Sequence, residues 1–179
     1  DTLIIQQAQG HFHKRLIGLY YPYLAEYCER WDIDYRLHGG GIAPWCLYPN
    51  PAMQVWGKYE LIAAAFRQGY ENVAWMDADS FICDPETDIR WAFQKTVNMV
   101  RWWPDATTSH LQGGDIYVKN NVEKSIYGEK FCQFLMQEGK YYLQRQPGLR
   151  GWFDQGFINE MTLYPESKSI FYELDVRWN

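Results

Sequence analysis

Hydrophobic and polar positions along the chain follow two periods in turn, which predicts strands that alternate with helices. Short apolar runs at 2–8, 33–37 and 73–76 are bounded by polar residues or glycines and are typical of buried strands. Between these runs, residues 13–30 and 53–68 carry apolar side chains at helical spacing. Strands and helices in this order favour a mostly parallel sheet with helices on both faces.

The second half of the chain continues this pattern. The elements predicted there are strands at 96–103, 114–118 and 169–174, a long helix capped by Asn120-Asn121, and a short helix at 153–161. Neither a linker nor an internal repeat divides the sequence. We therefore expect residues 1–179 to form a single α/β domain of Rossmann-like type, with a mixed, mostly parallel sheet flanked by helices.

The two longest predicted helices each have a face that should pack inward. These faces comprise Leu16, Tyr20, Tyr23, Leu24 and Tyr27 in the first helix, and Tyr127, Phe131, Phe134 and Leu135 in the later one. Pro22 should kink the first helix or mark a fresh first turn, because proline lacks the backbone N–H that a helix interior needs.

Composition and charge narrow the possible partners. Aromatic residues make up 18% of the chain; most should lie in the core, and some could line a sugar or base pocket. The net charge of −5, without a long Lys/Arg run, argues against non-specific binding to nucleic acid or anionic membranes. The sequence shows neither a bilayer-length apolar stretch nor a signal-peptide pattern. A cytoplasmic location is expected, or the Golgi lumen if an N-terminal anchor has been removed.

Cysteines and histidines give no metal or redox pattern. No pair among Cys28, Cys46, Cys83 and Cys132 has Cys-x-x-Cys spacing, so we expect free, buried thiols. His11 and His13 are interpreted as solvated loop residues rather than as ligands.

An acidic pair, Asp77 and Asp79, follows the apolar run 73–76 and is the strongest candidate site. Alternation along a strand would point both side chains to one side, at the sheet edge where ligands of α/β proteins gather. Two carboxylates there suit a divalent cation that holds a diphosphate. Aspartate is also common in plain turns, but clustered carboxylates repel one another unless a cation neutralises them, which favours the metal site. A second pair, Asp32 and Asp34, precedes its strand and is discounted.

Three further features have a functional and a structural interpretation. Gln112-Gly-Gly-Asp115 is either a tight turn or a place where the backbone approaches a ligand. Asp154 either complements the dipole of its helix or offers a carboxylate to a reacting sugar. Lys58 lies off the apolar stripe of its helix, where most lysines are solvated and a phosphate contact is the minority interpretation.

Several of these motifs resemble those of a known enzyme family. Trp75-Met-Asp-Ala-Asp79 is similar to the Trp-Met-Asp-x-Asp signature of the galactosyl- and xylosyltransferase family of yeasts and plants. Gln112-Gly-Gly-Asp-Ile-Tyr-Val-Lys-Asn120 resembles its Asn-x-Gly-x-Phe-x-x-Arg-Asn strand, and Asp154-Gln155 resembles its Asp-Gln pair at a helix start. The order of elements also matches, so the resemblance covers residues 2–160 through short motifs rather than close identity.

The resemblance implies a glycosyltransferase of the A-type fold that uses a nucleotide-sugar, UDP-sugar above all, and a saccharide or other hydroxyl acceptor. It implies a metal site at Asp77 and Asp79, in which Asp79 holds Mn²⁺ or Mg²⁺ and Asp77 contacts either the ribose or, through water, the metal, and it favours retention of configuration. The residues implied in donor binding are Gln6, Gln7, Ala8, Lys58, Asp77, Gln112 and Gly113. The catalytic candidates are Asp115, facing the donor sugar or the acceptor, and Asp154 and Gln155, at the reacting carbon. One departure is that no histidine follows His110, whereas the family has a late histidine as a metal ligand.

Two other functions compete with this prediction. A nucleotidyltransferase that makes nucleotide-sugars would also use paired acids and Mg²⁺, but it should have a basic, glycine-rich loop after the first strand, unlike Gln6-Gln-Ala-Gln-Gly10. A carbohydrate-binding module would explain the aromatic content, but such modules are mostly all-β, which the helical stripes contradict.

Overall fold

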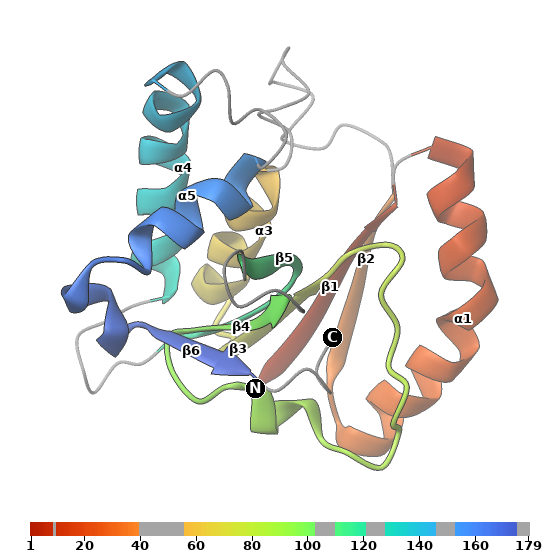
Figure 1. The fold of residues 1–179 in the computed structure, drawn as a ribbon. Helices are drawn as coiled ribbons and strands as arrows, with labels where there is room; N and C mark the ends of the chain where they lie inside the picture. Colours follow the sequence, from red (N-terminus) through yellow and green to blue (C-terminus); the bar gives the residue numbers. More distant parts are fainter. Residues whose placement is uncertain (9, 40–55, 103–109, 121–127, 146–152, 175–179) are drawn as a thin grey trace.

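A six-stranded sheet forms the centre of the fold (Figure 1), with the strand order β2-β1-β3-β5-β4-β6. This computed structural model describes residues 1–8, 10–39, 56–102, 110–120, 128–145 and 153–174. The strands are β1 (Thr2–Ala8), β2 (Asp34–Gly39), β3 (Asn72–Met76), β4 (Val97–Trp102), β5 (His110–Lys119) and β6 (Phe171–Leu174). Strand β5 runs antiparallel to β3 and β4, and the other described pairs are parallel. The predicted mixed, mostly parallel sheet is confirmed.

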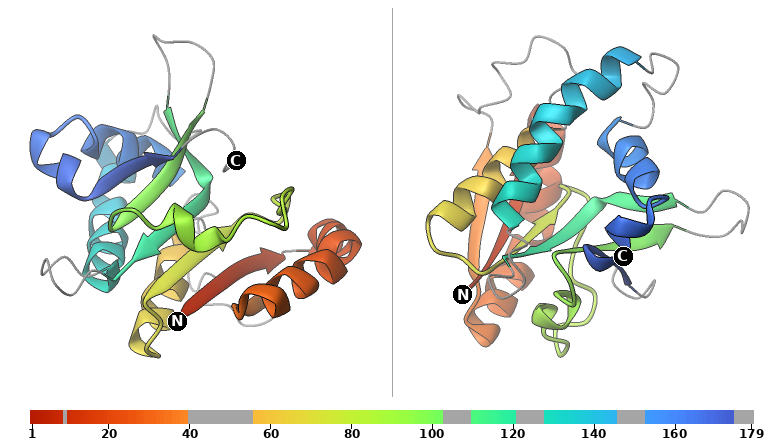
Figure 2. Two further views of the ribbon diagram at one scale, coloured as in Figure 1. Left: turned by 90° about the horizontal axis from the view of Figure 1, so that it is seen from below. Right: turned by 90° about the vertical axis from the view of Figure 1, so that its left-hand side faces the viewer.

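Helices cover both faces of this sheet (Figures 1 and 2). One face carries α1 (Gly10–Trp31), and the other carries α3 (Gly57–Arg67), α4 (Gly128–Arg145) and α5 (Phe153–Met161). The described elements also include the short 3-10 helices η2 (Ile89–Ala92) and η5 (Pro165–Ser169). Within the described ranges, no helix combines the length and the apolar character that crossing a membrane requires.

The alternation of side chains along the central strands creates a core on each face. In β3, Val73 and Trp75 pack with α3 and α4, whereas Ala74 and Met76 pack with α1. A strand buried on both sides must be apolar at successive positions, which explains the continuous run in the sequence. Each large apolar side chain that is fully buried in these layers contributes about 1.5–3 kcal/mol to stability.

Helix α1 is continuous from Gly10 to Trp31, so Pro22 does not mark a fresh first turn, and the kink stays a prediction. A proline ring crowds the carbonyl group four residues earlier, which here belongs to Gly18. Glycine adjusts its backbone more easily than other residues, so a proline four residues later should cost less at this position. The helix also begins earlier than expected, so that His11 and His13 are exposed on its first turns rather than in a loop.

Several side chains lie elsewhere than predicted. Tyr23 on α1 and Phe134 on α4 are exposed, although their positions had suggested inward faces. Cys28 and Cys132 are free and buried as expected, but Cys83 is free and exposed. The predictions for Tyr127 and Cys46 lie outside the described residues.

Candidate functional site

The acidic pair lies in a tight turn at the carboxyl end of β3. The strand ends at Met76, and residues 77–80 form a turn in which the N–H of Ser80 donates to the carbonyl oxygen of Asp77 at 3.0 Å. Strand alternation therefore does not determine where the two side chains point, and that part of the prediction was wrong. Asp79 is exposed and Asp77 is half-buried, so the turn presents one carboxylate to solvent and keeps the other close to the sheet.

A third carboxylate, Asp115 of β5, lies beside this turn. Strand β5 pairs with β3 so that Asp115 is opposite Met76, and the backbone N–H of Asp77 donates to Oδ1 of Asp115 at 3.4 Å. The Asp77 side chain is oriented separately, because Nε1 of Trp75 donates to its Oδ1 at 2.8 Å. The sheet thus brings together acidic residues that are 38 positions apart in the sequence.

Asp115 is affected electrostatically by both residues of the acidic pair. Burial, the largest cause, together with the negative charges of Asp77 and Asp79, raises the pKa of Asp115 from 3.8 to about 6. Hydrogen bonds from Ser80 and from the backbone of Asp77 act in the opposite direction. A cation placed among these groups would favour their charged forms, so the turn has the electrostatic character of a cation site.

Polar side chains of β1 and α1 form hydrogen bonds with the backbone of the turn. Gln6 of β1 is fully buried, and its Nε2 donates to the carbonyl oxygens of Asp77 and Ser80, both at 3.1 Å. Its Oε1 accepts a hydrogen bond from the hydroxyl of Tyr35 at 3.1 Å. The hydroxyl of Tyr20 on α1 donates to the carbonyl oxygen of Ala78. Backbone oxygens of three of the four turn residues are therefore fixed by side chains from β1 and α1.

This network gives Gln6 a structural role that the sequence did not predict. Its amide group forms hydrogen bonds with the turn. The predicted contact of Gln6 with a nucleotide stays a prediction. Gln7, the next residue, is half-buried, and Ala8 is fully buried against Ile17 and Ala78. These two residues end β1 at the same edge of the sheet as the acidic turn, because β1 and β3 are parallel neighbours.

Lys58 is buried in the first turn of α3, so the expectation that it is solvated was wrong. Its ammonium group lies 5.6 Å from the centre of the Tyr59 ring. Helix α3 begins at the edge of the sheet where β1 ends (Figure 1). A buried cation at a helix N-terminus on this edge is suited to bind an anion.

The remaining predicted residues lie on two neighbouring elements. Gln112 and Gly113 belong to β5, and Asp154 and Gln155 belong to the first turn of α5. Helix α5 contacts β5, so both motifs belong to one region of the fold. The side chains of these four residues lie outside what the structure describes.

A cavity of about 400 Å³ adjoins Asp115 on the α1 face of the sheet. Its floor includes Met76, Asp115 and Tyr117, and its outer wall includes Phe81 and Asp84 from the segment after the turn. This volume falls within the usual range for ligand pockets. The buried carboxylate therefore has a cavity beside it that is large enough for a substrate group.

Comparison with solved structures finds a similar fold. A crystal structure of a glycosyltransferase involved in the glycosylation of the major capsid of PBCV-1 matches with a TM-score of 0.70, covering 98% of this chain and 82% of that one. The chain has a glycosyltransferase fold. Sequence identity to this neighbour is 10%, so the likeness concerns the fold alone. No protein-family model matches the sequence, and no curated protein matches it either.

Within this glycosyltransferase fold, the described residues contain no group of three His, Cys, Asp or Glu side chains arranged to hold a metal ion. Sites that bind Mg²⁺ with a nucleotide commonly use only one or two carboxylates and complete the shell with phosphate oxygens and water. Asp77 and Asp79, with hard oxygen atoms at the edge of the sheet, fit that kind of site. The donor set therefore suits a metal that binds together with a diphosphate.

Sequence reasoning missed the two tyrosines that support this site, Tyr20 and Tyr35. Tyr20 was interpreted only as part of the apolar face of a helix, and Tyr35 was not singled out within the predicted strand 33–37. The available signal was the residue type itself, because a buried tyrosine usually needs a hydrogen-bond partner for its hydroxyl.

Proposed function

We propose that the protein is a metal-dependent glycosyltransferase that transfers a sugar from a nucleoside-diphosphate-sugar, UDP-sugar in the first instance, to a hydroxyl acceptor. The observation that carries this proposal is the convergence of Asp77 and Asp79 with buried Asp115 in this fold. The neighbour of similar fold, a glycosyltransferase, supports the same class of reaction.

In this proposal, Asp79 and Asp77 hold Mn²⁺ or Mg²⁺ together with the diphosphate of the donor. Asp79 is exposed and can reach the diphosphate, whereas Asp77 is held by Trp75 close to the strand end. When bound, the metal offsets the negative charge that develops on the departing nucleoside diphosphate. Lys58, at the start of α3, adds a positive charge on the same edge of the sheet.

Asp115 lies beside a substrate-sized cavity, so we assign it to the reacting sugars. As a carboxylate it accepts hydrogen bonds from sugar hydroxyls and orients them. During transfer, the bond between the anomeric carbon and the diphosphate oxygen breaks, a bond to the acceptor oxygen forms, and the proton of the acceptor hydroxyl passes to the departing diphosphate. We assign Asp154 and Gln155 to the anomeric carbon of the donor sugar. The resemblance to the galactosyl- and xylosyltransferase family favours retention of configuration at this carbon.

Calorimetric titration with UDP, with and without Mn²⁺, tests the donor site. We expect Mn²⁺ to raise the affinity for UDP at least tenfold, because the two carboxylates otherwise repel the diphosphate. Asp79→Asn should abolish this gain and the Mn²⁺-dependent hydrolysis of UDP-sugars, and thermal unfolding should show an intact fold. Asp32→Asn, in the discounted second acidic pair, is the matched control and should behave as the wild type. Equal UDP affinities with and without metal would contradict the proposal.

Two competing functions, a carbohydrate-binding module and a nucleotidyltransferase, can be compared with this proposal. The α/β architecture excludes an all-β carbohydrate-binding module. A nucleotidyltransferase would form a UDP-sugar from UTP and a sugar 1-phosphate, and product analysis with these two substrates distinguishes it from a glycosyltransferase.

A further inference from the structure

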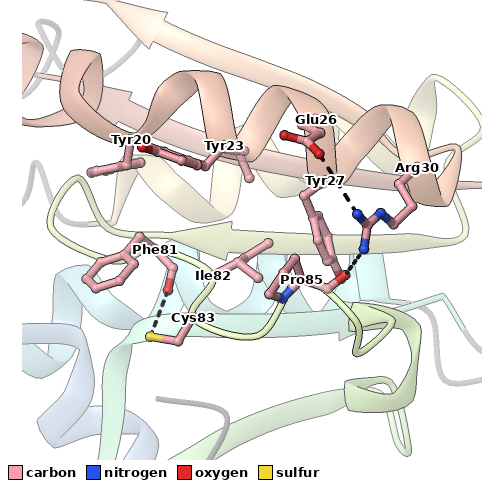
Figure 3. Close-up of a pocket in the computed structure, with 10 residues that line it drawn as sticks. Tyr20, Tyr23, Glu26, Tyr27, Arg30, Phe81, Ile82, Cys83 and Pro85 are labelled. Carbon is pink, nitrogen blue, oxygen red and sulfur yellow. Dashed lines mark hydrogen bonds and ion pairs between the residues drawn. The ribbon is translucent and has the colours of Figure 1, made fainter.

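A second pocket, of about 450 Å³, lies between α1 and the segment that follows the acidic turn (Figure 3). Helix α1 contributes Tyr20, Tyr23 and Tyr27, and the segment contributes Phe81 and Ile82 among others. Three of these side chains, those of Tyr27, Phe81 and Ile82, also line the cavity beside Asp115. The two cavities are therefore adjacent, and the segment after the turn forms part of the wall of both.

Several polar groups at this pocket, those of Tyr20, Tyr27 and Arg30, already have partners within the protein. The hydroxyl of Tyr27 donates to the carbonyl oxygen of Thr87 at 2.8 Å and accepts from the N–H of Ile89 at 2.7 Å. The guanidinium group of Arg30 lies 3.9 Å from the carboxylate of Glu26 on the same helix. A ligand would thus meet apolar surface and committed polar groups, which suits an apolar group better than a sugar ring with several hydroxyls.

Two aromatic side chains at the pocket are largely in contact with water. Tyr23 is 74% exposed and Phe81 is 59% exposed, and they lie on opposite sides of the pocket, on α1 and on the segment (Figure 3). Large exposed apolar surface that lines a cavity is typical of a binding site. A ligand that covers these rings would gain the free energy of removing them from water.

We propose that this pocket binds the apolar aglycone of the acceptor, an aromatic or aliphatic group joined to the hydroxyl-bearing part. The adjacent cavity would then place the hydroxyl-bearing part beside Asp115. This inference rests on the proposed glycosyltransferase function, and it narrows the acceptor from any hydroxyl compound to an amphiphilic glycoside or alcohol.

The native thiol of Cys83 provides a direct test of binding, because it is exposed and lines both cavities. Alkylation by N-ethylmaleimide, followed by peptide mass spectrometry at Cys83, would be measured with methyl, butyl and hexyl β-glucosides. Each methylene group buried in the pocket should lower the half-protecting concentration about fourfold. If all three glucosides protect equally, or none protects, the inference is overturned.

Two variants separate this pocket from the rest of helix α1. Tyr23→Ala removes an exposed ring from the pocket and should raise the half-protecting concentration of hexyl β-glucoside about tenfold. Leu19→Ala removes an equally exposed side chain (75%) from the same helix outside the pocket and should leave protection unchanged. Unchanged protection in Tyr23→Ala, or an equal loss in both variants, would contradict the inference.

Hydrolysis of UDP-sugars without an acceptor distinguishes the failure of this inference from the failure of the proposed function. Tyr23→Ala should hydrolyse the donor at the wild-type rate and transfer its sugar poorly to hexyl β-glucoside. If the wild type hydrolyses a donor but the aglycone length has no effect, only the pocket inference fails. If no donor is hydrolysed with Mn²⁺, the proposed function fails and the acceptor role fails with it.

Discussion

The hydroxyl of Tyr20 donates a hydrogen bond to the carbonyl oxygen of Ala78, the residue between Asp77 and Asp79. Helix α1 is thereby joined to the turn that carries the acidic pair. The same tyrosine lines the apolar pocket, so one side chain belongs to both the pocket and the support of the turn.

Replacing Tyr20 tests whether this hydrogen bond positions the turn. Tyr20→Phe removes the hydrogen bond to Ala78 and the one that the hydroxyl accepts from Gln6, and it keeps the ring, so we expect the affinity for UDP with Mn²⁺ to fall about fivefold. Calorimetric titration measures this loss. Tyr21→Phe removes a hydroxyl from the adjacent residue on the helix, which does not contact the turn, and should not change the affinity. Equal affinities in the wild type and in Tyr20→Phe would show that the turn is held without this bond.

Gln6 should matter more for stability than its neighbour in the strand. Gln6→Leu leaves the carbonyl oxygens of Asp77 and Ser80 without their buried donor, and we expect a loss of about 3 kcal/mol in the free energy of unfolding. Urea denaturation measures this loss. Gln7→Leu, at the half-buried next position, should cost less than about 1 kcal/mol. Similar losses in both variants would contradict the role of Gln6 in the turn.

Asp115 should make the metal-free protein less stable as the pH rises. Its pKa is raised from 3.8 to about 6, so the folded state retains a proton that the unfolded state releases within this range. Stability is therefore lost as the pH rises through this window, by about 3 kcal/mol in all. Asp115→Asn keeps an oxygen that can accept from the N–H of Asp77 and removes the charge.

Unfolding experiments without metal test this at two pH values. We expect Asp115→Asn to be more stable than the wild type at pH 8, by up to about 3 kcal/mol, with the difference shrinking below pH 4. If the wild type and Asp115→Asn are equally stable at pH 8, the ionised carboxylate of Asp115 does not destabilise the folded state.

Lys58 should contribute to donor binding through its charge. Lys58→Met has a similar length and removes the charge, and we expect the affinity for UDP with Mn²⁺ to fall about tenfold, in line with the loss of a charged hydrogen bond. Calorimetric titration at two salt concentrations measures the effect. Lys14→Met, at an exposed position of α1, is the control. An unchanged affinity in Lys58→Met would leave this lysine with a purely structural role.

Local periodicity was sufficient to predict most of the elements. The predicted limits of β1 and α5 agree with the structure, because an apolar run and an amphipathic stripe are properties of adjacent residues. Asn120 was predicted to cap the helix that follows, and its Oδ1 accepts from the N–H of Gly128, the first residue of α4. These features depend on short segments of sequence and were therefore predictable.

The candidate site was predictable only in part, because it depends on contacts between distant residues. The position of Asp77 and Asp79 after a strand was evident, but the orientation of the pair was not, since the strand ends at Met76. The contact between Asp77 and Asp115 results from the insertion of β5 between β3 and β4, which no local pattern encodes. The burial of Lys58 likewise depends on packing around α3.

The strand order has a consequence for biosynthesis. Strand β4 is synthesised before β5. In the sheet, however, β5 lies between β3 and β4, so β4 does not pair with β3. A nascent chain that has emerged only as far as β4 would carry the acidic turn exposed and without its buried neighbour. The acidic turn therefore acquires its buried neighbour Asp115 only after β5 has been synthesised and has paired with β3.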